Sequence, residues 1–473
     1  MGNRKKQPSS NRKKLSSDNR EKLSSRIGFI LLSAGCAIGL GNVWRFPFIT
    51  GRYGGALFVL IYLVCLVLLG VPVMTMEFAV GRASRKSVAR SFHEIEPAGS
   101  KWHIFSWFGM AGNYLLMMFY TTVAGWILAY VTYTARGAFA GLSVEAIGDI
   151  FGGLVSSPTG CVAWMIVVTL IGFGVCAIGL QKGVEQVTKT MMSALFVILL
   201  ILVVRAVTLP GAAEGLKFYL IPSLDGIRQY GAAEVIFAAM GQSFFTLSLG
   251  IGSMAIFGSY IGKERKIMGE AINVTLLDTL AALLAGLVIF PSCLAFGIAP
   301  DAGPPLIFIT LPNIFNMMPF SQLWAFLFFL FMFFAALSTV VAVFENIVSF
   351  AVDITGMPRR KACLINCAAL IVLALPCALG FNAWSGIQPM GEGTVILDLL
   401  DFIVSNNLLP LGALVYVAFC SFKIGWGWDK FLAEANEGSG ATFPMWLKYY
   451  CMIAMPIIIL SVFIFGYMSL FGG

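Results

Sequence analysis

Long apolar runs recur along the whole chain, and they limit the possible folds more than any other feature. Runs of 18 residues or more are typical of transmembrane helices, because only a helix satisfies its own backbone in lipid at this length. Only 11% of the residues are charged, against about 25% in soluble proteins, which excludes a soluble protein with a large core. We therefore predict an all-α membrane protein with about eleven transmembrane helices. The predicted spans are residues 27–49, 55–79, 105–134, 160–180, 189–208, 232–261, 268–298, 321–353, 361–380, 393–421 and 443–470.

The distribution of lysine and arginine predicts the orientation in the membrane. With the N-terminus inside, the inner segments hold 25 of the basic residues and the outer segments hold six, which agrees with the positive-inside rule. Residues 1–26 are polar and basic, and we expect a disordered cytoplasmic segment without a cleavable signal. An odd number of spans places the C-terminus outside. Because the net charge of +8 is concentrated beside the spans, it indicates contact with the lipid bilayer, and we expect no nucleic-acid partner.

Two of the predicted spans are interrupted near their middle by glycine and small polar residues. Residues 33–42 are SAGCAIGLGN in the first span, and residues 244–253 are FFTLSLGIGS in the sixth. Glycine inside a helix costs about 1 kcal/mol relative to alanine. The two spans hold matching positions in two five-span halves, residues 27–208 and 232–421, and 443–470 is an additional helix. This pairing favours a transporter with inverted repeats and a site at the midplane; the alternative is that the glycines only allow close helix packing.

Oxygen-bearing side chains near the interruptions indicate a sodium site. Sodium takes hard oxygen ligands, and an unwound helix frees carbonyl groups that have no partner within the helix. The candidate side-chain donors are Asn42, Thr246, Ser248, Ser338 and Thr339. For the last two, hydrogen bonding to their own helix is the alternative. Asp278 lies inside the seventh span, where a carboxylate costs roughly 2.5–3.5 kcal/mol. We expect it to face a polar interior, either at an ion site or in a structural hydrogen bond.

Charged residues at the ends of the spans suggest two gates. Arg45 ends the interrupted first span on the outer side, and Asp401 begins the tenth span on the same side. An exposed ion pair is worth only about 0–1 kcal/mol, which suits a gate that must open. Arg20 and Asp353 offer a similar pair on the inner side, although Arg20 is equally explained by attraction to the membrane surface.

Enzyme signatures are missing from the sequence. The two histidines, His93 and His103, lie near an inner loop without a metal-ligand spacing, and no nucleotide-binding glycine loop or nucleophile elbow is present. The ten cysteines form no CxxC pair, and most fall in apolar segments, so we expect no disulfide framework. We therefore expect a protein that is not an enzyme.

The interrupted spans resemble the neurotransmitter:sodium symporter family, and in particular its bacterial amino-acid members. Residues 34–47, AGCAIGLGNVWRFP, are similar to the first-span motif of the family, and residues 241–250, GQSFFTLSLG, to its sixth-span motif. Residues 337–339 stand where the family has its eighth-span sodium pair. The resemblance covers about residues 20–470 and implies the LeuT fold, with two inverted five-helix repeats and broken helices 1 and 6. It also implies a sodium-coupled amino-acid symporter in the inner (plasma) membrane of a bacterium.

The resemblance implies two sodium sites and a substrate site. The first sodium site would use Ala37, Asn42, Thr246 and Asp278, with the carboxylate of the bound amino acid. The second would use Gly35, Ile38, Ala335, Ser338 and Thr339. The substrate would contact Ala37, Gly39, Gly41, Leu116, Tyr120, Phe245, Thr246, Ser248, Ile251, Thr339 and Val343. Among these, Tyr120 would hold the substrate carboxylate and Phe245 would cover the substrate.

Three positions narrow the choice of substrate and ions. Monoamine carriers of the family have aspartate at the position of Gly39, so the substrate here must supply its own carboxylate, which favours an α-amino acid. The implied pocket is apolar and disfavours charged side chains, so we expect an apolar or aromatic amino acid. Asp278 replaces a common asparagine, and Ala282 stands where one bacterial member has glutamate. The charge of Asp278 predicts transport that is independent of chloride.

The predicted mechanism is alternating access, in which sodium and substrate bind from outside and are released inside. A channel is a competing class, but it should show a charged ring or a repeated filter sequence, and the chain has neither. A sensor that binds an amino acid on the same fold without transporting it stays open as an alternative. A membrane enzyme is the third alternative and lacks a catalytic constellation.

Overall fold

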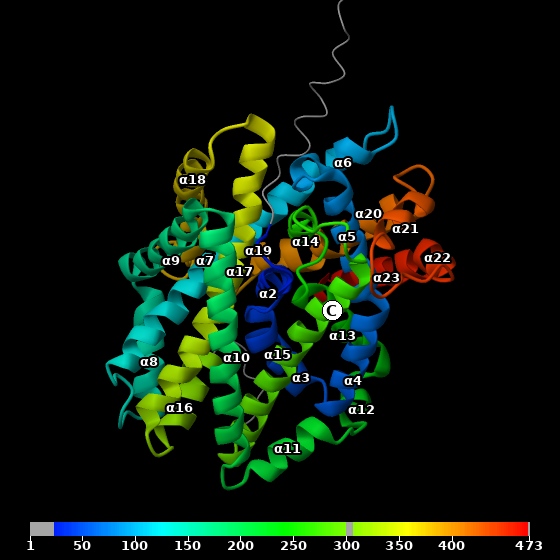
Figure 1. The fold of residues 1–473 in the computed structure, drawn as a ribbon. Coiled ribbons are helices and arrows are strands. Elements are labelled where there is room, and N and C mark those ends of the chain that lie inside the picture. The colour runs from blue at the N-terminus through cyan, green and yellow to red at the C-terminus, as the bar shows by residue number, and fades with distance from the viewer. Residues whose placement is uncertain (1–22, 299–305, 472–473) are drawn as a thin grey trace, which may run out of the picture.

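The computed structural model describes residues 23–298 and 306–471 (Figure 1). Most of the predicted disordered segment, including Arg20, lies outside these residues. The described part of the chain is built from helices and loops, with one isolated β-bridge between Arg265 and Ser439. The prediction of an all-α protein is confirmed.

The helices follow the order of the predicted spans, and η marks short 3-10 or π segments. The first half contains α2 (Arg26–Ala37), η1 (Gly41–Arg45), α3 (Phe46–Arg52), α4 (Ala56–Cys65), η2 (Leu66–Gly70), α5 (Val71–Ser84), α6 (Val88–Ile95), η3 (Trp102–Ile104), α7 (Phe105–Ala135), α8 (Val144–Ser156), α9 (Pro158–Ile178), η4 (Leu180–Glu185) and α10 (Gln186–Val207).

Two short helices, α11 (Ala212–Leu220) and α12 (Asp225–Tyr230), connect the two halves. The second half contains α13 (Ala232–Thr246), α14 (Ser253–Gly258), α15 (Ile267–Ala295), η5 (Leu306–Thr310), α16 (Leu311–Asn316), α17 (Ser321–Thr355), α18 (Arg359–Leu379), α19 (Ile396–Phe402), η6 (Ile403–Leu408) and α20 (Leu409–Ser421). After it come α21 (Trp428–Ala435), α22 (Leu447–Tyr449), η7 (Tyr450–Ala454) and α23 (Met455–Phe471).

Nine helical spans in the described residues are long and apolar enough to cross a membrane. A tenth is formed by α2 with η1 and α3, which are bent by 56° from one another. The predicted sixth span is occupied by α13 and α14, each too short to cross a bilayer alone. The total of eleven spans and the inverted repeat stay predictions.

The predicted bounds differ most at the fifth span, which begins at Leu180 and not at residue 189. Residues 181–188 were predicted as a loop because Lys182 and Glu185 are polar. In the structure Glu185 is buried and accepts hydrogen bonds from the backbone N–H of Ser24, at 2.7 Å, and from its hydroxyl, at 2.6 Å. Because a buried carboxylate needs such partners, this polar end of the helix is held inside the protein.

α17 lies at the centre of the core, and the last span lies at the edge of the protein. In the most apolar stretch of α17, 78% of the residues are buried, against 17% in the span Leu447–Met468. α17 packs against α7, α10 and α2. In Figure 1, α6 lies at one end of the bundle and α11 at the other, with α2 between them. The broken first span therefore lies inside the protein, while the last span is left to face lipid.

Candidate ion and substrate site

The first span is broken where its sequence is richest in glycine. α2 ends at Ala37, and Ile38 after it has an extended backbone, with φ −69° and ψ 100°. The chain becomes helical again at Gly41. The carbonyl groups at the end of α2 therefore lack the partners that a continuous helix would provide.

The sixth span is broken between Thr246 and Ser253. Within this segment Ser248, Gly250 and Gly252 have φ values of 51°, 98° and 76°. Glycine adopts such values without strain, whereas they are uncommon for a residue such as serine. The glycines therefore explain how the helix can unwind here, and both predicted interruptions are seen as breaks in the structure.

The breaks bring three predicted sodium ligands together on three different elements. Asn42 Nδ2 donates to Asp278 Oδ1 at 2.8 Å, and Thr246 Oγ1 donates to Asp278 Oδ2 at 3.0 Å. All three side chains are buried. Asn42 Oδ1 in turn accepts the N–H of Gly39 at 3.1 Å. A buried carboxylate surrounded by carboxamide and hydroxyl groups is a suitable set of donors for a hard cation, which would replace these hydrogen bonds.

The residues predicted for the second sodium site lie around Thr339 on α17. Its Oγ1 lies 3.2 Å from the carbonyl oxygen of Gly35 and 3.3 Å from those of Ile38 and Ala335. Ser338 Oγ donates to the carbonyl of Ala335 at 2.9 Å. One hydroxyl proton cannot satisfy three carbonyl oxygens, so this cluster is rich in acceptors. The three carbonyls and two hydroxyls are five oxygen atoms of the kind that sodium binds in unwound transporter helices.

A cavity lies beside these two clusters. Its lining residues are Ala37, Gly39, Leu40, Gly41, Leu116, Tyr120, Phe245, Ser248, Thr339 and Leu409. Tyr120 Oη accepts the backbone N–H of Leu40 at 3.1 Å, so its hydroxyl lies against the broken end of the first span. Predicted substrate residues Thr246, Ile251 and Val343 are buried but do not line the cavity. Leu40 and Leu409 line it and were missed, because neither stands out among apolar neighbours.

Glycine at position 39 is required by the spacing inside this cavity. A Cβ atom at Gly39 would lie 2.4 Å from Tyr120 Oη and 2.6 Å from Thr339 Oγ1. Both distances are too short for ordinary packing. The small residue at this position therefore lets Tyr120 and Thr339 approach the broken end of α2.

At the predicted outer gate, the contact made by Arg45 differs from the predicted ion pair. The guanidinium of Arg45 lies over the ring of Phe245, with 4.2 Å between Cζ and the ring centroid. Asp401 accepts a hydrogen bond from Ser405 Oγ at 2.7 Å, and no direct Arg45–Asp401 ion pair is found among the described residues. Arg45 Nη1 is buried without a hydrogen-bond partner. In this conformation Arg45 is held against Phe245 by a cation–π contact.

The inner gate is described only in part, because Arg20 lies outside the described residues. Its predicted partner, Asp353, accepts the backbone N–H of Ser87 through Oδ2 at 2.8 Å. Nearby, Arg359 pairs with the buried Glu345, and Tyr260 donates to Glu345 Oε1 at 2.8 Å. Charged contacts that sequence analysis did not identify therefore lie beside the predicted inner gate.

Glu77 on α5 is a further site residue that was missed. Its side chain is fully buried and accepts the backbone N–H groups of Gly250 and Met254, at the break in the sixth span. The amide groups of an unwound helix need such acceptors. A glutamate inside the apolar run of residues 71–80 was the available signal, because carboxylates within spans are rare and functional.

A second network holds the same break from α7 and α17. Asn113 Nδ2 donates to the carbonyl of Ile251 at 2.9 Å, and its Oδ1 accepts from Asn346 Nδ2 at 2.8 Å. Ser253 Oγ also donates to Asn113 Oδ1, at 3.3 Å. Together with Glu77, these contacts fix the unwound segment from both sides.

A second, wider cavity is lined by residues that include Arg45, Tyr53 and Glu234. Tyr53, at its wall, donates to Glu234 Oε1 at 2.9 Å. Burial, together with this hydrogen bond, raises the pKa of Tyr53 to about 12. Its phenol therefore stays protonated at neutral pH and keeps its role as a donor.

Comparison with known proteins identifies the family. The family model of the sodium:neurotransmitter symporters matches residues 20–140 and 152–471. The chain belongs to the sodium:neurotransmitter symporter family. As a member of this family it is a sodium-dependent, multi-pass membrane transporter and not an enzyme.

Individual members of the sodium:neurotransmitter symporter family match over nearly the whole chain. The sodium-dependent transporter YhdH of Bacillus subtilis is 36% identical, covering 93% of this chain and 96% of that protein. The human sodium- and chloride-dependent GABA transporter 2 is 27% identical, covering 93% of this chain and 79% of that protein. The solved structure of MhsT in complex with L-phenylalanine has a TM-score of 0.85 and 35% identity, covering 94% of this chain and 99% of that one. The LeuT-like helical fold is thereby confirmed.

Proposed function

We propose that this symporter imports an apolar or aromatic α-amino acid together with sodium, by alternating access. The observation that carries the proposal is the position of Asp278. Its carboxylate lies with Asn42 and Thr246 next to a cavity that also presents Tyr120. A cation and a carboxylate held side by side would each lower the cost of burying the other, which couples their binding.

The proposal includes two sodium ions. The first would lie among Ala37, Asn42, Thr246 and Asp278, and the second among Gly35, Ile38, Ala335, Ser338 and Thr339. Support comes from the two separate clusters of oxygen atoms at the breaks of the first and sixth spans. Each ion that moves inward gains about 2.3 kcal/mol per 100 mV of membrane potential. Two ions would make uphill uptake feasible.

An apolar substrate is supported by the lining of the cavity. Leu40, Leu116, Phe245 and Leu409 line it, and it contains no charged side chain among the described residues. A charged substrate side chain would therefore be buried without a partner. MhsT, similar in fold, was solved with L-phenylalanine bound, which agrees with an aromatic or aliphatic substrate.

Chloride independence is the third part of the proposal. Asp278 would supply beside the sodium a negative charge that a chloride ion supplies in relatives named as chloride-dependent. Ala282, one turn further along α15, offers no second carboxylate. Under this proposal the first sodium is balanced by Asp278 and by the substrate carboxylate.

We also propose the orientation and organisation expected from the sequence. The N-terminus would be cytoplasmic and the C-terminus outside, in the inner membrane of a bacterium. Residues 27–208 and 232–421 would be the two inverted repeats, and residues 443–470 an additional helix. The low burial of the last span supports its placement outside the repeats.

The test is uptake of radiolabelled L-phenylalanine and L-leucine into proteoliposomes, with an inward sodium gradient or with potassium in its place. We expect accumulation above the external concentration only with the sodium gradient. Thr339→Val removes the hydroxyl that faces Gly35 and should abolish this accumulation. Thr190→Val is the matched control, because Thr190 is exposed and bonds only its own helix. Binding without accumulation would favour the sensor, and uptake that ignores sodium would reject the proposal.

A further inference from the structure

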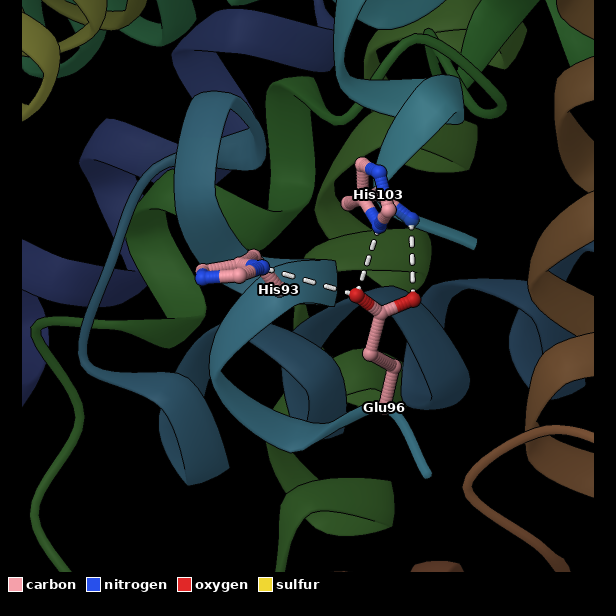
Figure 2. A group of neighbouring side chains, drawn as sticks. All are labelled: His93, Glu96 and His103. Atoms are coloured by element: carbon pink, nitrogen blue, oxygen red, sulfur yellow. Dashed lines mark hydrogen bonds and ion pairs between the residues drawn. The ribbon is translucent and has the colours of Figure 1, made fainter. Parts of the chain in front are cut away.

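The loop between the second and third spans brings together the only two histidines of the chain. His93 lies in the last turn of α6, Glu96 directly follows that helix, and His103 lies in η3, before α7. Figure 2 shows both imidazole rings directed toward the carboxylate of Glu96. Sequence spacing did not reveal the group, because the turn after α6 folds back to place His103 beside it.

The distances in this group are close to those around a bound metal ion. His93 Nδ1 and His103 Nδ1 lie 3.5 Å and 2.7 Å from Glu96 Oε1, and the three ligand atoms are within 4.8 Å of one another. In a tetrahedral zinc site, with bonds of about 2.0–2.2 Å, neighbouring donor atoms lie about 3.3–3.6 Å apart. The shorter contact is a hydrogen bond that a metal ion would replace. Only small shifts of the side chains are therefore needed.

The carboxylate of Glu96 is held in place by a serine hydroxyl and a backbone N–H group, in addition to the imidazoles. Ser100 Oγ donates to Glu96 Oε2 at 2.9 Å, and the backbone N–H of His103 donates to the same oxygen at 3.1 Å. These bonds occupy Oε2 and leave Oε1 facing the two rings. Supporting hydrogen bonds of this kind orient the ligands of metal sites.

The exposure of the three side chains suits an ion that arrives from solution. The Glu96 side chain is 9% exposed, whereas those of His103 and His93 are 45% and 66% exposed. The Glu96 carboxylate is thus fixed in place, and the two imidazole rings are free to close over an ion. Water would fill the remaining position. Two imidazoles and one carboxylate suit zinc and similar divalent transition metals better than calcium or magnesium, which prefer oxygen ligands.

We propose that His93, Glu96 and His103 form a binding site for a divalent transition-metal ion of the zinc class, and that the bound ion slows transport. An ion held by all three would tie the end of α6 to the start of α7. The N-terminal end of α6 lies at the inner gate, where the N–H of Ser87 bonds Asp353 and where a Cβ at Gly252 would meet Val88 at 2.6 Å. Fixing α6 would therefore resist movement of the broken sixth span.

Binding is tested by calorimetric titration of zinc chloride into the full-length protein, purified without a polyhistidine tag. We expect one ion per chain, and a loss of binding of more than about 100-fold in His93→Gln, Glu96→Gln and His103→Gln. Ser100→Ala should weaken binding by about 10–100-fold, because it removes an outer hydrogen bond. Glu94→Gln is the matched control, since Glu94 is an exposed carboxylate on the same helix and should leave affinity unchanged.

Cobalt supplies an independent measurement that does not depend on transport. Cobalt(II) bound in a tetrahedral site gives visible absorption bands, and these should be seen in the natural protein and absent in the double variant His93→Gln/His103→Gln. Sodium-dependent thermal stability, measured in parallel, shows whether the variants are folded. Undiminished zinc binding by a folded double variant would overturn the proposal, because the site would lie elsewhere.

The effect on transport is tested in proteoliposomes loaded with zinc or with a chelator. We expect uptake to slow several-fold with zinc on the side that carries this loop, and zinc to have no effect on the double variant. Equal inhibition of the double variant, or zinc binding at the three residues without any change in uptake, would overturn the regulatory role. The binding measurements stand even if the transported substrate differs from the one proposed.

Discussion

At position 278 a buried carboxylate lies within hydrogen-bonding distance of both Asn42 and Thr246. Replacing it with a carboxamide keeps the shape of the side chain but removes its charge. The charge is the property that matters, because a cation in a buried site must be balanced nearby.

For Asp278→Asn we expect weaker sodium-dependent uptake and a gain of chloride dependence. A neutral side chain leaves the first sodium without its balancing charge, which a chloride ion can then supply. The measurement is uptake at fixed sodium with chloride exchanged for gluconate. Uptake by the natural protein should be the same in chloride and in gluconate. If uptake by the variant is also the same in the two, the proposed role of Asp278 is contradicted.

For Gly39→Ala we expect a loss of amino-acid affinity of about tenfold or more. The added methyl group would press on Tyr120 Oη and Thr339 Oγ1, and overpacking of this kind costs about 1–3 kcal/mol. Equilibrium binding of labelled amino acid in sodium measures the effect. Gly148→Ala serves as the control, because a methyl group at Gly148 meets nothing within 4 Å; equal losses in both variants would show that the cavity is not involved.

At the scale of elements, the broken sixth span is held by partners from other helices. Glu77 on α5 accepts two of its amide groups, and Asn113 on α7 donates to one of its carbonyls. Backbone contact adds to this, since a Cβ at Gly412 would lie 1.8 Å from the carbonyl oxygen of Gly250. The unwound segment is thus a fixed part of the structure and not a flexible loop.

For Glu77→Gln we expect lower stability and slower uptake. Glutamine offers a single acceptor oxygen, so one amide of the unwound segment would face an NH₂ group and lose its partner, at about 1–3 kcal/mol. Thermal unfolding in sodium measures the loss. Glu214→Gln, at an exposed position of α11, should leave the unfolding temperature unchanged; an unchanged temperature in Glu77→Gln as well would remove Glu77 from this role.

The spans were predictable from sequence because hydropathy is a local property, and so were the breaks, because glycine marks them. The motifs also named Asn42, Thr246 and Thr339, which the structure brings to the two breaks, although ion binding itself stays a prediction. The position of Glu77 inside an apolar run was a signal, but the groups that it bonds were not predictable from sequence. Neither was the role of Leu409, since both depend on which elements meet. The His93–Glu96–His103 group was missed for the same reason.

For the whole molecule, the number of spans determines on which side of the membrane the C-terminus lies. An odd number with the N-terminus inside requires an external C-terminus. Alkaline phosphatase fused after Gly473 should therefore be active in a bacterial host, and green fluorescent protein at the same position should be dark. Fusions at the loop of His93 should give the opposite results. A fluorescent C-terminal fusion would mean an even number of spans, and the assignment of the last segment would be wrong.

The contact between Arg45 and Phe245 determines how dissolved salt acts on this part of the protein. Dissolved ions screen an exposed ion pair over about 8–10 Å, so a gate built on one would loosen as ionic strength rises. A guanidinium resting on the face of an aromatic ring, with one nitrogen shielded from water, responds far less to such screening. The strength of this contact should then vary little with ionic strength. Sodium would act on the Arg45–Phe245 contact by binding at its own site, and hardly at all by screening charge.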